Sequence, residues 1–181
     1  MKTMRLPSRF IPPRPTPRLG LAGTLALIAM LAGFGCFIYS LPNPLRCITA
    51  ALVCALYGYV VVVNRREKHR FKVMASSRKG ESICEFARSF NARQTDTWII
   101  RVAYQELQLL LQSYVPAFPV RASDSLLNDL KIDPDDVEDL LQDIAERSRR
   151  SLDQAENNPY FRKVQTVSDL VFFINTQPAK A

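Results

Sequence analysis

The chain has 181 residues, of which 48% are hydrophobic, and its formal net charge is +7. This positive charge belongs to the N-terminal part, because residues 81–181 hold 11 basic and 16 acidic side chains, a net charge of −5. A nucleic-acid-binding domain needs a basic folded surface, so the acidic C-terminal part argues against nucleic acid as a partner.

A basic segment, residues 1–18, precedes two apolar segments that carry no charged side chain. The first, 19–41, is long enough to cross a bilayer, which takes a helix of about 20 residues, and the second, 47–63, is near the lower limit. Basic residues lie before the first segment and after the second, which predicts that both termini are cytoplasmic. The sequence therefore predicts a transmembrane hairpin over 19–63, with a turn at 40–46, in a multi-pass protein of the bacterial inner membrane.

Small residues recur at helical spacing in both predicted spans. They are Ala22, Ala26, Ala29 and Gly33 in the first span, and Ala50, Cys54 and Gly58 in the second. Such stripes let two helices approach closely in lipid, although the general frequency of alanine and glycine in spans explains them equally well.

A secretory signal peptide has the same basic start and apolar run. The first run is longer than the usual apolar core of a signal peptide and a second span follows at once, so the sequence favours the hairpin. Only Cys84 lies outside the predicted spans. Neither a disulfide framework nor a four-ligand zinc site is therefore expected.

The segment 64–80 is predicted to be a basic juxtamembrane linker, in which Ser76, Ser77 and Gly80 discourage a long regular helix. Basic side chains near an anionic bilayer each contribute about 1 kcal/mol of binding, although a topology signal also explains these charges. The candidate residues for binding lipid headgroups are Arg65, Arg66, Lys68, Arg70 and Lys72. His69, the one histidine, is expected to be a solvated side chain.

Residues 81–181 have helical periodicity, and no stretch alternates as a half-buried strand does. We expect a short helix over 81–90, a clear helix from Thr95 or Asp96 to about Tyr114, and a short helical piece over 124–130. Thr166 and Asp169 resemble a capping box that opens a last helix. The sequence thus predicts an acidic, all-α domain over 81–181.

The strongest helix start is Asp133 followed by Pro134, with Asp135 and Asp136 in the first turn. The predicted buried side of this helix contains Val137, Leu140, Leu141 and Ile144. Most of its remaining surface is negative, through Asp135, Asp136, Glu138, Asp139, Asp143 and Glu146. Arg147, Arg149 and Arg150 complement the C-terminal end of the helix dipole.

The order of these helices and two short motifs resemble the acyl carrier protein family over about residues 95–177. The loop end Asp129-Leu130-Lys131-Ile132-Asp133 is similar to the family's Asp-Leu-Gly-x-Asp-Ser-Leu, and Thr166-Val167-Ser168-Asp169 is similar to its Thr-Val-x-Asp. The stretch 129–141 followed by Tyr160-Phe161 is more closely similar to an uncharacterised bacterial branch of carrier-like domains. The resemblance implies a small helical bundle whose acidic second helix is recognised by basic protein partners.

Carrier proteins hold 4'-phosphopantetheine on a serine at the start of the second helix, and that position here is Pro134. Asp124-Ser125-Leu126 spells the carrier tripeptide nine residues upstream. The apolar residues expected six, seven and ten positions after the serine are Leu140, Leu141 and Ile144 if counted from Pro134. Counted from Ser125, the same positions are Lys131, Ile132 and Asp135, so Pro134 fits the family pattern better.

No Gly-rich phosphate loop, paired-histidine metal motif or histidine base near a serine or Cys84 is present in the sequence. The sequence therefore predicts a membrane-anchored, non-catalytic, acyl-carrier-like interaction module without cofactor or metal. Two alternatives stay open. One is a working carrier modified at Ser125 in a lipid or polyketide pathway, and the other is a structural subunit that acts through its spans. The acidic side chains could also serve only to solubilise their helix.

Overall fold

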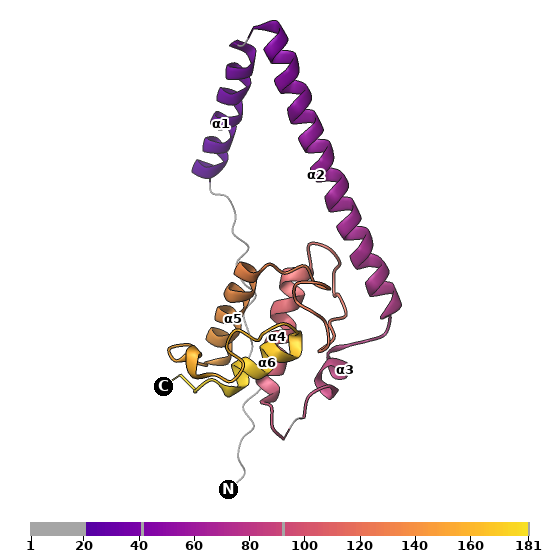
Figure 1. Cartoon of the computed structure of the whole chain (residues 1–181), viewed down its shortest axis with the longest axis vertical. Coiled ribbons are helices and arrows are strands. Elements are labelled where there is room, and N and C mark those ends of the chain that lie inside the picture. Colours follow the sequence, from indigo (N-terminus) through magenta and orange to yellow (C-terminus); the bar gives the residue numbers. More distant parts are fainter. Residues whose placement is uncertain (1–20, 41, 92, 181) are drawn as a thin grey trace. The chain divides into compact units, whose positions relative to one another are not determined.

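The computed structural model describes residues 21–40, 42–91 and 93–180. Within these ranges the chain forms six α-helices, one 3₁₀ turn and no strand, which confirms the predicted all-α class. Figure 1 labels the helices along the chain. The basic segment 1–18 lies outside the described residues. The chain divides into two compact units, Met1–Arg65 and Arg66–Ala181.

The first unit contains α1 (Leu21–Ser40) and the apolar N-terminal part of α2 (Asn43–Ser77), up to Arg65. Of the helices in the described residues, α2 is the one long and apolar enough to cross a membrane, and its apolar side chains, such as Leu52 and Leu56, are exposed. The predicted turn at 40–46 is shorter than expected. Pro44 already lies in the first turn of α2, where proline disrupts no helical hydrogen bond.

The two arms of the predicted hairpin do not pack on each other along the described residues. A Cβ atom added to Gly33 or Gly58 would meet no atom within 4 Å. The small-residue stripes therefore mediate no close helix approach in this structure, and the hairpin remains part of the proposal below.

The prediction of an irregular linker over 64–80 is wrong, because α2 continues to Ser77. The serines weighed against a helix lie in its last turn, where Ser76 and Ser77 donate to the carbonyls of Val73 and Met74. Gly80 comes after the helix and adopts a left-handed φ of 98°. Lysine, arginine, glutamate and methionine fill most of the preceding turns, and these are good helix formers.

The second unit contains α3 (Ile83–Arg88), α4 (Thr97–Leu111), α5 (Pro134–Ser148), the 3₁₀ turn η1 (Ala155–Asn157) and α6 (Val167–Thr176). Local signals explain where these helices begin. Ser82 and Glu85 form a capping box for α3, the side chain of Asp96 caps α4, and Thr166 and Asp169 form the predicted capping box of α6. The helix α4 ends at Leu111, before the predicted Tyr114.

The core of the second unit forms around α4, which packs against α3, α5 and α6. Its buried side includes Ile99, Ala103 and Leu107, which fall on one helical stripe. The predicted helical piece over 124–130 is instead a series of turns. The reason is that its backbone bonds elsewhere: the Leu126 amide donates to the carbonyl of Gln165, before α6, at 2.9 Å.

Candidate functional site

The acidic helix α5 begins as the sequence predicts, with Asp133 at the N-cap and Pro134 at the first turn. Proline suits this place, because its missing amide would have no helical partner and its fixed φ is helical. Asp135 and Asp136 follow in the first turn, where the helix dipole favours negative charge. The helix ends at Ser148. Its C-cap residue, Arg149, has a left-handed backbone (φ 56°), and the Arg149 amide donates to the carbonyls of Ala145 and Glu146.

One side of α5 is buried and the opposite side carries the carboxylates. Leu140, Ile144 and Ala145 are buried, while Val137 and Leu141 are half-buried. The predicted apolar side is therefore confirmed. Asp143 is half-buried, and the exposed carboxylates are those of Asp135, Asp136, Glu138, Asp139 and Glu146.

Two of the three arginines near the end of α5 bind α4 or the C-terminal residues. Arg147 forms an ion pair with Glu106, a buried residue of α4. Arg150 lies 3.6 Å from the carboxylate of Asp96 and donates to the carbonyl of Gln177 at 2.9 Å. Within the described residues, the five exposed carboxylates of α5 form no ion pair or hydrogen bond with another side chain.

Ser125 directly precedes the turns over 126–129, between α4 and α5. Its amide donates to Asp129 Oδ2 at 2.9 Å, and its Oγ accepts from the Asn128 amide at 3.2 Å. This reciprocal pattern is the one that polar residues form at a helix start. Ser125 is half-buried, and its hydroxyl oxygen is engaged in holding this turn together.

Four of the five candidate lipid-binding residues, Arg65, Arg66, Lys68 and Lys72, have exposed side chains on α2. The exception is Arg70. Its guanidinium donates to the carbonyls of Asn128 and Asp129, in the turns that follow Ser125. Arg70 therefore binds the protein's own backbone, which the charge pattern alone could not indicate.

The residue after Arg70 also belongs to the folded unit. Phe71 is completely buried, with its ring stacked on Tyr114 at 4.6 Å and edge-on to Phe118 at 5.4 Å. In the sequence it is a single aromatic residue within a basic run, so no periodic apolar pattern identified it as a core residue.

A buried ion pair fixes the end of the same segment. Arg78 donates to both carboxylate oxygens of Asp124 at 2.7 Å, and it also donates to the carbonyl of Pro119 at 3.1 Å. Both residues are buried, with 9% of Arg78 and 2% of Asp124 exposed. A bidentate pair with additional hydrogen bonds is the geometry that compensates for removing two charges from water.

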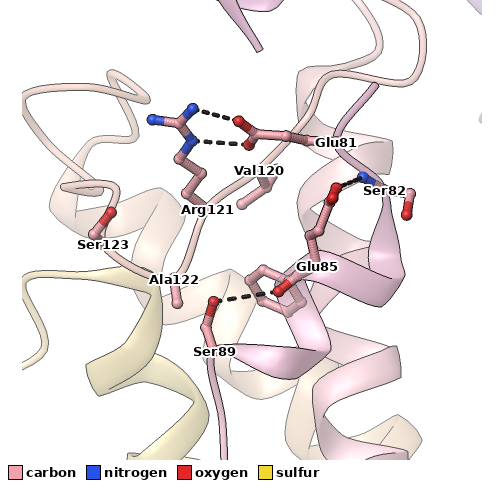
Figure 2. A pocket seen from close by; sticks show the side chains of 9 residues that line it. Glu81, Ser82, Glu85, Ser89, Val120, Arg121, Ala122 and Ser123 are labelled. Atoms are coloured by element: carbon pink, nitrogen blue, oxygen red, sulfur yellow. Dashed lines mark hydrogen bonds and ion pairs between the residues drawn. The ribbon is translucent and has the colours of Figure 1, made fainter. Parts of the chain in front are cut away.

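A cleft of about 270 Å³ lies between α3 and the residues after Pro119 (Figure 2). Val120, Ala122 and Phe86 supply its apolar lining, and Ser82, Ser89 and Ser123 line its polar part. Arg121 faces Glu81 across the cleft, with Nε donating to Glu81 Oε2 at 2.8 Å and Nη2 to the other oxygen. Sequence patterns did not indicate this cleft, because its residues come from two separate segments.

The Glu81 and Arg121 side chains shift each other's pKa. The hydrogen bonds from Arg121 hold the pKa of the Glu81 carboxyl below its ordinary value, and the carboxylate of Glu81 raises the pKa of Arg121. Both groups are therefore charged at neutral pH, and they form an ion pair at the rim of the cleft.

The lining of the cleft contains no histidine or cysteine. His69 and Cys84 are exposed on α2 and α3. Among the residues that the structure describes, no group of three or more histidine, cysteine, aspartate or glutamate side chains could hold a metal ion. No protein-family model, curated protein or solved structure matches this chain.

Proposed function

We propose that this chain is a membrane-anchored, non-catalytic, acyl-carrier-like module that binds a basic protein partner through α5. The observation that supports the proposal most strongly is the exposure of the carboxylates of Asp135, Asp136, Glu138, Asp139 and Glu146 on a helix whose other side is buried. Unpaired charges of one sign on a helix give fast, salt-sensitive encounters with a surface of opposite charge.

The start of α5 supports the non-catalytic part of the proposal. Pro134 occupies the place at which a carrier needs its serine, and proline offers no hydroxyl for 4'-phosphopantetheine. The other candidate, Ser125, uses its hydroxyl oxygen and amide within the turn that it begins. The module we propose would therefore keep the recognition helix of a carrier without carrying a substrate.

The anchor in this proposal is a hairpin in the bacterial inner membrane, with both termini in the cytoplasm. The apolar length of α2 supports one span, and the apolar segment 19–41 supplies the second. The basic side chains of Arg65, Arg66, Lys68 and Lys72 are exposed, as residues that bind anionic headgroups must be.

A photo-crosslinking amino acid at Gln142, an exposed position of α5, tests the partner-binding surface in native membranes. We expect a discrete crosslinked product that Glu138→Lys weakens by about tenfold, since reversal of a charge at an interface costs about 1.4 kcal/mol or more. The same product should weaken as salt is raised.

Glu156→Lys is the matched control, because Glu156 is also exposed but lies in η1. If Glu138→Lys and Glu156→Lys reduce the crosslinked product equally, net charge rather than the position of the charge on α5 determines the contact. A product that resists both salt and Glu138→Lys would contradict the proposed role of the acidic helix.

A further inference from the structure

The buried stripe of α4 continues beyond the part of the helix that the core covers. Ala103 and Leu107 are completely buried. Leu110 lies three positions after Leu107, on the same face of the helix, yet it is 38% exposed. Leu109 beside it is 36% exposed. The last turn of α4 therefore presents two leucine side chains that the second unit covers only in part.

The last turn of α4 lies beside the start of α5. The two helices pack on each other, and Figure 1 shows them side by side. They are antiparallel, because Trp98 at the start of α4 donates to the carbonyl of Arg147, near the end of α5, at 3.4 Å. The Arg147 side chain pairs with Glu106. Leu109 and Leu110 lie three and four positions after Glu106, so they share its side of α4, which faces α5.

The apolar side of α5 is incompletely covered at the same end of the helix pair. Val137 precedes the buried Leu140 by three positions, and Leu141 precedes the buried Ile144 by three, so the four residues form one helical stripe. Val137 and Leu141 are nevertheless only half-buried. The stripes of both helices thus leave the core where α4 finishes and α5 begins. We call the following set the apolar end: Leu109, Leu110, Val137 and Leu141.

Carboxylates border the apolar end. Asp133 stands at the N-cap of α5, but its side chain makes no capping hydrogen bond. Glu138 precedes Leu141 by three positions and so lies on the same side of α5. The exposed carboxylates at the start of α5 are those of Asp133, Asp135, Asp136, Glu138 and Asp139.

Few basic side chains offset these carboxylates. Lys131 is exposed two positions before Asp133. Arg70 approaches the same segment, where its guanidinium donates to the carbonyls of Asn128 and Asp129. Residues 108–111, the last turn of α4, have no charged side chain. Even with Lys131 and Arg70 counted, the carboxylates are in excess, which opposes contact with an anionic bilayer and favours a basic partner.

We propose that the apolar end and the carboxylates beside it form one docking surface for a basic amphipathic helix of the partner protein. The apolar side chains of that helix would contact Leu109 and Leu110, and its lysines or arginines would pair with the carboxylates. This inference deepens the proposed function and rests on it, since it adds α4 to the α5 surface. An apolar strip bordered by charge selects a partner that carries both features, because burial supplies affinity and charge speeds the encounter.

The test uses the full chain in phosphatidylcholine nanodiscs and two photoreactive synthetic peptides. One is a helix former with lysines along one face and leucines along the other, and the second has the same length and charge with glutamine in place of each leucine. The amount of crosslinked chain is measured against peptide concentration, so peptide that contacts only lipid is not counted. The bilayer is the same for every variant.

Three substitutions are compared in this assay. Leu109→Gln and Leu110→Gln introduce a good helix former and remove the apolar side chain. Leu127→Gln is the matched control, because Leu127 is 52% exposed but lies outside α4 and α5. The fluorescence of Trp98 in urea verifies that each variant is folded.

We expect the leucine peptide to bind the native chain at least about fivefold more tightly than the glutamine peptide. Leu109→Gln or Leu110→Gln should each weaken binding of the leucine peptide about fivefold, the loss expected when the exposed part of a leucine is no longer buried by a partner. Leu127→Gln should change neither peptide. Equal binding of the two peptides to the native chain, which requires no variant, or equal losses in Leu109→Gln and Leu127→Gln, would overturn the inference.

Glu138→Lys separates this inference from the proposed function. It should weaken both peptides, because both are basic. If it weakens both while the two peptides bind the native chain equally, the acidic surface of α5 is supported and the apolar contact is wrong. If it weakens neither peptide, the proposed role of α5 and this inference are both wrong.

Discussion

At the scale of single residues, Arg78 and Asp124 form a buried ion pair on which we expect the stability of the second unit to depend. Each is buried, and each would be left as an unpaired charge if the other were removed. Asp124 also accepts the Arg121 amide at 2.8 Å, and its carbonyl accepts the Val167 amide at 3.0 Å. Asp124 therefore links Arg78, which follows α2, with Arg121 through its carboxylate, and with the start of α6 through its backbone carbonyl.

We expect substitutions of Arg78 and Asp124 to have strongly non-additive effects on the free energy of unfolding. Arg78→Met or Asp124→Asn alone should lower the free energy of unfolding by about 3–5 kcal/mol, because each leaves a buried group without its partner. The double variant should be less destabilised than the sum of the two losses. Urea unfolding followed by the fluorescence of Trp98, the one tryptophan, measures all three variants. Additive losses would show that the two groups do not interact.

We expect the ion pair between Glu81 and Arg121 to make the stability of the fold depend on pH. Its pKa is held below the ordinary value of 4.5 by the hydrogen bonds from Arg121, so its pairing stabilises the fold above about pH 4.5 and is lost as the pH falls through the lowered pKa. The urea midpoint of the native chain should exceed that of Glu81→Gln at neutral pH, and the difference should disappear in acid. Glu156→Gln, at an exposed position in η1, should show no such pH-dependent difference. A difference for Glu81→Gln that persists in acid would mean that the ion pair is not its cause.

At the scale of secondary-structure elements, sequence patterns predicted the helices that have local start signals. Capping residues and 3.6-residue periodicity located α4, α5 and α6, because both features act within a few residues of the chain. Sequence patterns did not predict that α2 continues to Ser77, because the contacts of this part of the helix are with residues far away in the sequence. Its basic composition suggested a solvated linker, whereas Arg70, Phe71 and Arg78 are held by residues about 40 to 60 positions away.

The burial of Phe71 indicates that the C-terminal part of α2 belongs to the core of the second unit. Phe71→Ala should destabilise the second unit by about 3–5 kcal/mol, the usual cost of removing a buried aromatic ring. Val73→Ala is the matched control, because Val73 lies on the same helix and is 54% exposed, and it should change stability by about 0.5 kcal/mol or less. Trp98 fluorescence in urea again gives the measurement. Equal effects of the two substitutions would place Phe71 outside the core.

At the scale of the whole molecule, charge divides the chain into a basic N-terminal part and an acidic C-terminal part, and this division was visible in the sequence. The acidic side chains of α5 were also predictable, since an amphipathic helix must place its charged residues away from the core. The cleft beside Glu81 and Arg121 could not be predicted from the sequence, and neither could the hydrogen bonds from Arg70 to the carbonyls of Asn128 and Asp129. Both depend on contacts between distant segments, which one sequence does not reveal.

The central claim is that this membrane-anchored module binds partners through α5 without carrying a prosthetic group. The most direct measurement is the intact mass of the full chain, purified from its native cells and again after incubation with coenzyme A and a permissive phosphopantetheinyl transferase, beside a Ser125→Ala control. We predict an unmodified mass in every sample, because Pro134 has no hydroxyl and Ser125 is held within its turn. A mass increase equal to 4'-phosphopantetheine that disappears in Ser125→Ala would contradict the proposed function and identify a working carrier.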